Sequence, residues 1–209
     1  MNLRFVLILG ALSAFGPLAI DFYLPAFPAM AQAFATDEQH IQTTLAAYFL
    51  GLSIGQLAYG PVADRFGRRK PLLFGVTLFT LASLACAYAP NLDTLIVARF
   101  VQALGGCAGM VLSRAIVSDK CDAVASAKVF SQLMLVMGLA PILAPMLGGV
   151  LVNLAGWQSI FLALSLFSAA CLLAVSLGLP ESFPAGMPRQ PLSRAFRQYW
   201  RLLWDRVFI

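Results

Sequence analysis

The sequence predicts an all-α membrane protein built as a bundle of six transmembrane helices. Of its 209 residues, 60% are hydrophobic and only 11% are charged, whereas about a quarter of the residues of a soluble domain are charged. Lipid rather than water must therefore face much of its surface. A spanning backbone must also pair its own N–H and C=O groups, so the segments that cross the lipid must be helices.

Six apolar segments are long enough to cross a membrane, which takes about 20 residues for about 30 Å of hydrocarbon. They are Leu3–Leu24, Ile41–Val62, Pro71–Ala89, Leu95–Val117, Val129–Leu154 and Ile160–Leu179. The first is too long for a signal peptide and has no small-residue cleavage pattern, so we expect it to be retained. Residues 1–180 should form one six-helix domain, and residues 181–209, with several prolines and arginines, a linker. Within this linker, Ser193–Trp204 is either an amphipathic helix on the membrane surface or a plain basic segment.

Basic residues alternate strictly with the loops. The loops after the first, third and fifth segments contain no Lys or Arg, whereas the loop after the second contains four. The positive-inside rule then places both ends of the chain in the cytoplasm. The net charge of +5 therefore reports topology and gives no reason to expect a nucleic-acid partner.

The basic loop between the second and third segments has the most specific pattern. It reads Gly60-Pro61-Val62-Ala63-Asp64-Arg65-Phe66-Gly67-Arg68-Arg69-Lys70. This pattern resembles the signature loop of the major facilitator superfamily, a family of secondary transporters. The resemblance implies two six-helix halves joined by a cytoplasmic linker. The chain matches the first half, so residues 181–209 would lead into a second half that the chain lacks.

The same resemblance implies a cytoplasmic gate. Its residues would be Gly60, Asp64, Arg65, Gly67, Arg68 and Arg69, with Arg114 and Asp119 of the fourth segment as partners that pair with the Asp64 loop. The physical basis would be a charge network with two stable arrangements at a domain interface. The alternative interpretation is that these charges only fix the topology.

Asp21 is the first candidate for transport chemistry. An ionised carboxylate in hydrocarbon is costly, so such acids usually face a cavity or a partner and are able to exchange a proton. The run Asp21-Phe22-Tyr23-Leu24-Pro25 resembles the first-helix signature of the bicyclomycin/chloramphenicol-resistance branch of drug:proton antiporters. In that branch the aspartate is implicated in proton coupling or substrate recognition. The alternative is an interfacial carboxylate at a helix end.

Arg99 is the second candidate, and Gln102 lies one turn further along the same face of the fourth segment. Arg99 and Asp21 should lie at comparable depth on different helices, so we expect them to pair. The stretch from Arg99 to Gly106 resembles the family motif arginine-x-x-glutamine-glycine-x-glycine, with Ala103 where glycine is commoner. The alternative is an arginine that extends to the outer interface.

The fifth segment is rich in glycine and proline. It contains Gly138, Pro141, Pro145, Gly148 and Gly149. Prolines four residues apart free backbone carbonyls and bend a helix, and glycines allow close packing. The pattern resembles a fifth-helix motif of proton-coupled exporters, although membrane helices are enriched in both residues in general.

No nucleophile–base pair, phosphate-binding glycine loop or metal-ligand cluster stands out in the sequence, so we expect no enzyme activity, no cofactor and no metal. The cysteines show no close-pair spacing. The predicted function is proton-coupled multidrug efflux across a bacterial inner membrane, with protons, a drug-like small molecule and membrane lipid as partners. The alternatives are a narrow-specificity metabolite exporter and a truncated membrane module that does not transport.

Overall fold

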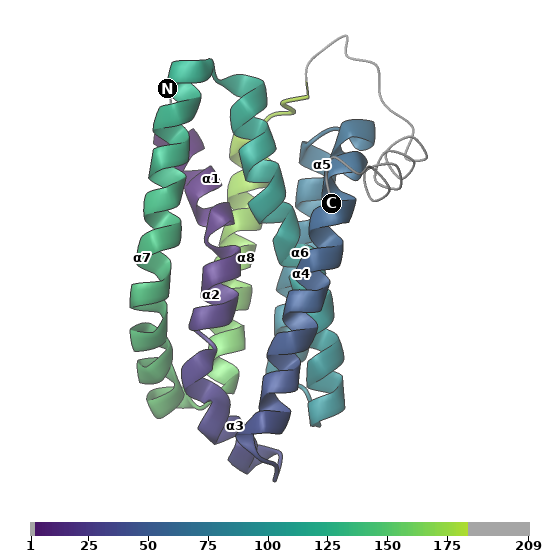
Figure 1. Cartoon of the computed structure of the whole chain (residues 1–209), viewed down its shortest axis with the longest axis vertical. Coiled ribbons are helices and arrows are strands. Elements are labelled where there is room, and N and C mark those ends of the chain that lie inside the picture. Colours follow the sequence, from purple (N-terminus) through teal and green to yellow (C-terminus); the bar gives the residue numbers. More distant parts are fainter. Residues whose placement is uncertain (1–2, 184–209) are drawn as a thin grey trace, which may run out of the picture.

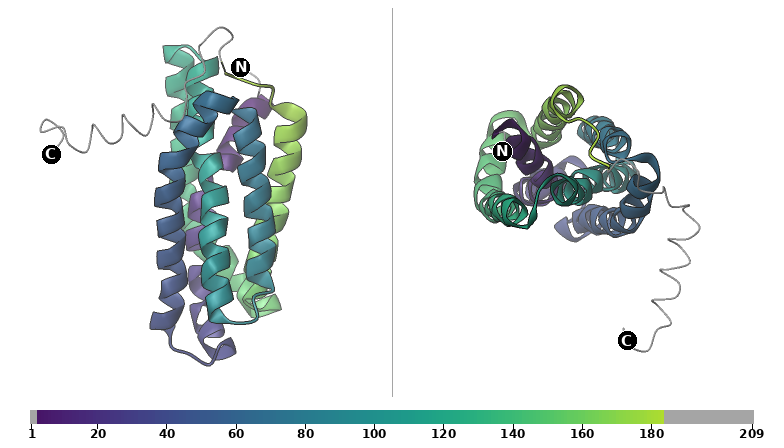
Figure 2. Two further views of the ribbon diagram at one scale, coloured as in Figure 1. Left: turned by 90° about the vertical axis from the view of Figure 1, so that its right-hand side faces the viewer. Right: turned by 90° about the horizontal axis from the view of Figure 1, so that it is seen from above.

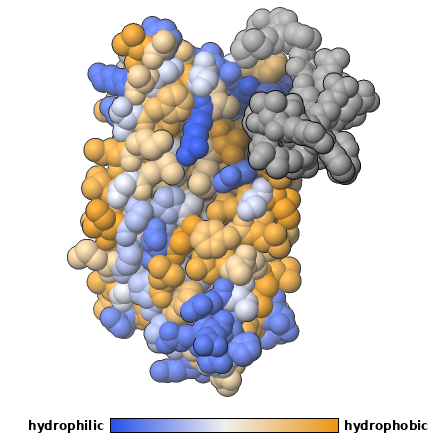
Figure 3. Space-filling model, viewed as in Figure 1, coloured by the Kyte–Doolittle hydropathy of each residue, from blue (hydrophilic) through white to orange (hydrophobic). Residues whose placement is uncertain are grey.

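The computed structural model of the protein describes residues 3–183. Most of the predicted linker, including the segment Ser193–Trp204, lies outside the described residues. Nearly all of the described chain is helical, and the helices run alongside one another in a single bundle (Figure 1). Hydrophobic residues cover the flanks of the bundle, and hydrophilic residues gather at its two ends (Figure 3).

Six helical rods are long and apolar enough to cross a membrane, as the sequence predicts. The first rod is divided into α1 (Leu3–Ser13), α2 (Phe15–Asp21), the 3-10 helix η1 (Leu24–Ala26) and α3 (Phe27–Ala33). The other five rods are single helices: α4 (Glu38–Phe66), α5 (Arg69–Ala87), α6 (Leu92–Lys120), α7 (Ala123–Ala155) and α8 (Gln158–Gly178).

The first rod differs most from the prediction, because its helical path continues beyond Leu24 to Ala33. Its interruptions have a local cause. Pro17 has no N–H to donate to the carbonyl of Ser13, and the helix breaks between α1 and α2 at this point. A second break follows α2, so that Asp21 lies at the end of a helix inside the rod.

The helix starts are fixed by side chains that accept a hydrogen bond from the first turn. Asp37 accepts from the N–H of His40 at 2.8 Å, Asn91 from that of Thr94 at 2.9 Å, and Asp122 from that of Ala125 at 2.8 Å. Such caps satisfy N–H groups that the helix itself leaves unpaired. They explain why α4, α6 and α7 begin before the apolar segments do.

Helix α6 is the centre of the bundle, with α4 and α5 packed on either side of it (Figure 2, left). Glycines allow these close crossings. A Cβ on Gly51 would lie 2.5 Å from the carbonyl oxygen of Phe100, and one on Gly105 would collide with the backbone nitrogen of Phe79. By contrast, α7 is peripheral. Only 11% of its most apolar 18-residue stretch is buried, against 61% of the corresponding stretch of α6.

Two glycine substitutions should separate packing from helix propensity. Gly105→Ala should lower the thermal stability of the purified chain, with a cost of about 1–3 kcal/mol, because its methyl group would force α5 and α6 apart. Gly138→Ala is the matched control: a Cβ there meets nothing within 4 Å, and alanine is favoured over glycine in a helix by up to about 1 kcal/mol. Equal melting temperatures for the two variants would contradict the packing argument.

Candidate functional site

Arg99 lies at the centre of the bundle and is completely buried. Its Nη1 donates to Oε1 of Gln102 at 2.6 Å, and its Nη2 donates to the backbone carbonyl of Ala19 at 3.0 Å. Gln102 in turn donates from Nε2 to the hydroxyl of Ser83 at 2.7 Å. The predicted candidates Arg99 and Gln102 thus belong to one chain of hydrogen bonds, which links α2, α6 and α5.

Aromatic rings surround the Arg99 guanidinium. Its central carbon lies 4.3 Å from the ring centres of both Tyr23 and Tyr48, and 5.7 Å from that of Phe161. A desolvated cation–π contact contributes about 2 kcal/mol or more, so the rings offset part of the cost of burying the charge. Two polar atoms in this cage, Nε of Arg99 and the hydroxyl of Tyr48, have no hydrogen-bond partner among the described residues.

The expected pairing of Asp21 with Arg99 is wrong for this structure: no ion pair joins them within residues 3–183. Arg99 instead contacts the carbonyl of Ala19, two residues earlier. Arg99 thus meets the backbone of α2 rather than an acidic side chain. Asp21 is half-buried, with no hydrogen bond or ion pair in the described part of the chain.

The glycine-rich part of α7 packs beside Asp21. A Cβ on Gly148 would collide with the carbonyl of Phe22, and one on Gly149 would lie 4.0 Å from Pro25. Pro141 and Pro145 lie within α7, which remains helical from Ala123 to Ala155. The predicted motif therefore divides in two. Gly148 and Gly149 lie against the bend that follows Asp21, whereas a Cβ on Gly138 would meet no other part of the chain within 4 Å.

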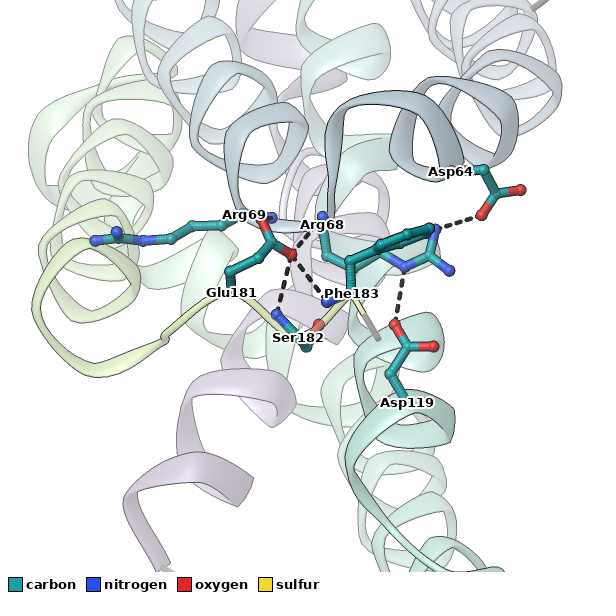
Figure 4. A network of polar contacts seen from close by, with 7 residues as sticks. All are labelled: Asp64, Arg68, Arg69, Asp119, Glu181, Ser182 and Phe183. Atoms are coloured by element: carbon teal, nitrogen blue, oxygen red, sulfur yellow. Dashed lines mark hydrogen bonds and ion pairs between the residues drawn. The ribbon is translucent and has the colours of Figure 1, made fainter. Parts of the chain in front are cut away.

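A second polar cluster lies at the end of the bundle that carries the loop between α4 and α5, here called the basic end (Figure 4). Arg68 donates from Nε to Asp119 at 2.9 Å and from Nη1 to Asp64 at 2.6 Å. Burial by itself lowers the pKa of Arg68, but the hydrogen bonds to Asp119 and Asp64 outweigh that effect and raise it. Arg68 thus joins the end of α4 to the end of α6.

Glu181, which the sequence analysis did not identify, completes this cluster. Its carboxylate accepts four backbone N–H bonds, from Arg68 at 2.8 Å, Arg69 at 3.3 Å, Ser182 at 3.0 Å and Phe183 at 3.0 Å. Partial burial raises the pKa of Glu181, but these bonds outweigh it and lower the pKa overall. The sequence signal was an acidic residue two positions after the end of the sixth apolar segment.

The segment after α8 is held at further points. The ring of Phe183 lies 5.2 Å from the guanidinium carbon of Arg68, and Arg69 donates from Nη2 to the carbonyl of Ser176 at 2.7 Å. Gly67 has a φ of +87°, and a Cβ there would lie 2.5 Å from a carboxylate oxygen of Glu181. Glycine at this position therefore permits both the left-handed turn and the approach of Glu181.

Three of the predicted gate residues lie outside this network. The expected pairing of Arg114 with the Asp64 loop is wrong, because Arg114 contacts the sulfur of Met137 at 3.7 Å and forms no ion pair among the described residues. Arg65 lies over the ring of Phe66 at 5.4 Å, and Gly60 lies within α4. Position along a helix predicted their depth but not the direction of their side chains.

A family comparison agrees with this architecture. The model of the Major Facilitator Superfamily matches residues 7–209. The chain belongs to this superfamily of transporters. It is 45% identical over 212 residues to the Bacillus subtilis protein called uncharacterized MFS-type transporter YdgK, with 100% of this chain and 52% of that protein covered.

Other relatives carry names linked to drug resistance. The chain is 35% identical to the bicyclomycin resistance protein homolog of Haemophilus influenzae over 85% of this chain and 45% of that protein. It is 32% identical to multidrug resistance protein D of Escherichia coli, over 94% of this chain and 50% of that protein. The chain thus spans about half the length of the curated relatives it matches.

Solved structures show the same fold. The proton:xylose symporter XylE matches with a TM-score of 0.76 at 16% identity, over 86% of this chain and 45% of that one. The transporter PepTSo matches with a TM-score of 0.75 at 17% identity, over 91% of this chain and 40% of that one. The six-helix bundle therefore corresponds to one half of a major facilitator fold.

The two tyrosines of the Arg99 cage should respond oppositely to loss of their hydroxyl groups. Tyr48→Phe keeps the ring and removes a buried hydroxyl without a partner, so thermal stability should be unchanged or higher. Tyr23→Phe also keeps its ring but loses the 2.6 Å hydrogen bond to Thr44, and should lose about 1 kcal/mol of stability. Melting curves of the purified variants test this. A larger loss for Tyr48→Phe than for Tyr23→Phe would contradict it.

Stability should depend on pH through Glu181. Because its folded-state pKa lies below the usual value of about 4.3, the ionised form stabilises the fold above that pH. The stabilisation is lost as pH falls through the lower folded-state value. Glu181→Gln should therefore melt below the wild type near neutral pH, and the two melting temperatures should converge as the pH falls through the lower folded-state value.

The control for this experiment is Glu38→Gln, the same substitution at an exposed position at the opposite end of the bundle. It should differ little from the wild type across the same pH range. If the melting temperatures of the wild type and Glu181→Gln differed by the same amount at every pH, the charge of Glu181 would be ruled out as the cause of the difference.

Proposed function

We propose that the chain is one six-helix half of a proton-coupled exporter of drug-like small molecules in a bacterial inner membrane. The observation that carries this proposal is the separation of the two intramembrane charges. Arg99 is held by rings, an amide and a carbonyl, and Asp21 is left without a partner at a helix end within the first rod. The names of the relatives in Haemophilus influenzae and Escherichia coli support the same class of substrate.

Asp21 is the proposed site of proton coupling. A carboxylate that is not held in an ion pair can release its proton to water and take one up again, and it can also attract a cationic substrate. Proton and substrate then compete for the same group. Arg99 remains charged throughout, because a guanidinium does not lose its proton in proteins. Gln102 fixes the orientation of Arg99, and Gly148 and Gly149 hold α7 against the bend beside Asp21.

The cluster at the basic end is the proposed cytoplasmic lock. Arg68, Asp64 and Asp119 join α4 to α6, and Glu181 ties the segment after α8 to the start of α5. Rocking of two such halves about a midplane site is the general mechanism of these transporters. A charge network at one end can favour the state in which that end is closed.

A second half is the proposed partner for the exposed face of the bundle. The face seen in Figure 3 carries a broken strip of hydrophilic residues between hydrophobic flanks, as expected for a surface that lines an aqueous path. Arg114 and the exposed apolar side chains of α7 would then meet the second half. Because the chain spans half the length of its relatives, a membrane module that does not transport by itself is the second candidate.

Replacement of Asp21 tests the coupling. In the full-length transporter that carries this sequence, Asp21→Asn should abolish efflux driven by a pH gradient, because asparagine cannot carry the proton. Cells that express the wild type should show resistance to several unrelated toxic compounds, and an uncoupler should remove it. Asp93→Asn, an exposed acid in the first turn of α6, is the matched control and should leave resistance intact.

Three outcomes would contradict the proposal or part of it. Uncoupler-sensitive efflux that persists in Asp21→Asn would exclude Asp21 as the coupling group. Resistance to one metabolite only, with no effect of other compounds, would favour the narrow-specificity exporter. Vigorous efflux by the 209-residue chain alone would show that it does not need a second, different half.

A further inference from the structure

An apolar groove lies between α4 and α5 near the basic end, with α6 as its floor. It has a volume of about 550 Å³. Ala58 and Val62 of α4 form one wall, Phe74 and Leu78 of α5 form the other, and Leu104 of α6 lies between them. Lys70, the second residue of α5, also lines the groove. The three helices stand next to one another in Figure 2, left.

The length of the groove matches one leaflet of a membrane. From Lys70 to Leu78 the helix α5 rises about 12 Å at about 1.5 Å per residue. Half of the hydrocarbon core is about 15 Å thick. A groove that starts at the basic end and follows α5 to Leu78 therefore extends through about four fifths of the hydrocarbon of a single leaflet.

Lys70 differs from the two basic residues before it, because those two are bonded to other groups of the chain. Arg68 and Arg69 are engaged with Asp119, Asp64 and the carbonyl of Ser176. Lys70 is exposed and forms no ion pair or hydrogen bond within residues 3–183. Its side chain borders an apolar groove, and this combination complements a phosphate ester attached to an acyl chain.

We propose that this groove binds one acyl chain of an anionic phospholipid from the leaflet at the basic end, and that Lys70 contacts its phosphate. The proposal rests on the membrane placement of the bundle and does not depend on the transported substrate. Apart from Lys70 and the hydroxyl of Tyr59, the lining is apolar, whereas a site for a drug-like molecule needs several placed polar groups.

The lining of the groove also fits an acyl chain. An acyl chain has no polar groups to satisfy, and the groove offers it apolar side chains from three helices, α4, α5 and α6.

Lipid retention by the purified 209-residue chain tests the proposal. The chain is loaded with phosphatidylglycerol or with phosphatidylcholine of the same acyl composition, and bound lipid is counted by native mass spectrometry. The wild type should retain phosphatidylglycerol preferentially. Lys70→Ala should weaken that retention about fivefold, the effect of one basic residue near an anionic surface, whereas Lys128→Ala, another exposed lysine in the sequence, should not.

A groove-filling variant and a cross-link test the location. Leu78→Trp should reduce retention of both lipids, and Leu166→Trp, on the exposed surface of α8, should leave it unchanged. Phosphatidylglycerol with a photoreactive acyl chain should label α4 and α5 of the wild type, a result that needs no variant to fold. Equal retention of the two lipids by the wild type would overturn the proposal. Labelling of α7 and α8 as strong as that of α4 and α5 would also overturn it.

Discussion

Arg99 brings a permanent positive charge into the middle of an apolar bundle, and several neighbouring helices contribute to its accommodation. A buried charge without compensation costs several kcal/mol. Here the compensation comes from the α2 carbonyl of Ala19, from Gln102 on α6 itself, and from aromatic rings on the first rod, α4 and α8. Each of these groups must keep its position for the charge to be tolerated. The cation therefore determines how the central helices face one another.

The basic end uses charge in a different way. Arg68 and Asp119 keep only 12% and 13% of their side-chain area exposed, whereas Asp64 keeps 52%, so the bond to Asp64 is the more accessible to water. Together with the bonds of Glu181 and Arg69, these contacts join the ends of α4, α5, α6 and α8. Breaking these contacts returns partly hydrated groups to water, whereas breaking the Arg99 cage would leave a fully buried charge without partners. The centre of the bundle therefore tolerates less rearrangement than the basic end does.

The sequence predicted the part of this structure that depends on position along the chain. Hydropathy and loop charge can be evaluated from the order of residues along the chain, so the six spans and their order were predictable. The Asp21–Arg99 pair failed because equal depth says nothing of direction around a helix. Glu181 was missed because its partners at Arg68 and Arg69 are 113 and 112 residues away. Arg114 failed for the same reason as Asp21: its depth was predictable and its facing was not.

Both polar clusters involve α6, and this connects the centre of the bundle to its end. Arg99 and Asp119 lie about 30 Å apart along this helix at about 1.5 Å per residue. Helix α6 contains no proline and is packed against α4 and α5 by glycines on both sides, so it is one uninterrupted helix between the two clusters. The α2 carbonyl that holds Arg99 lies two residues from Asp21, so this helix connects the neighbourhood of Asp21 to the contact between Asp119 and Arg68.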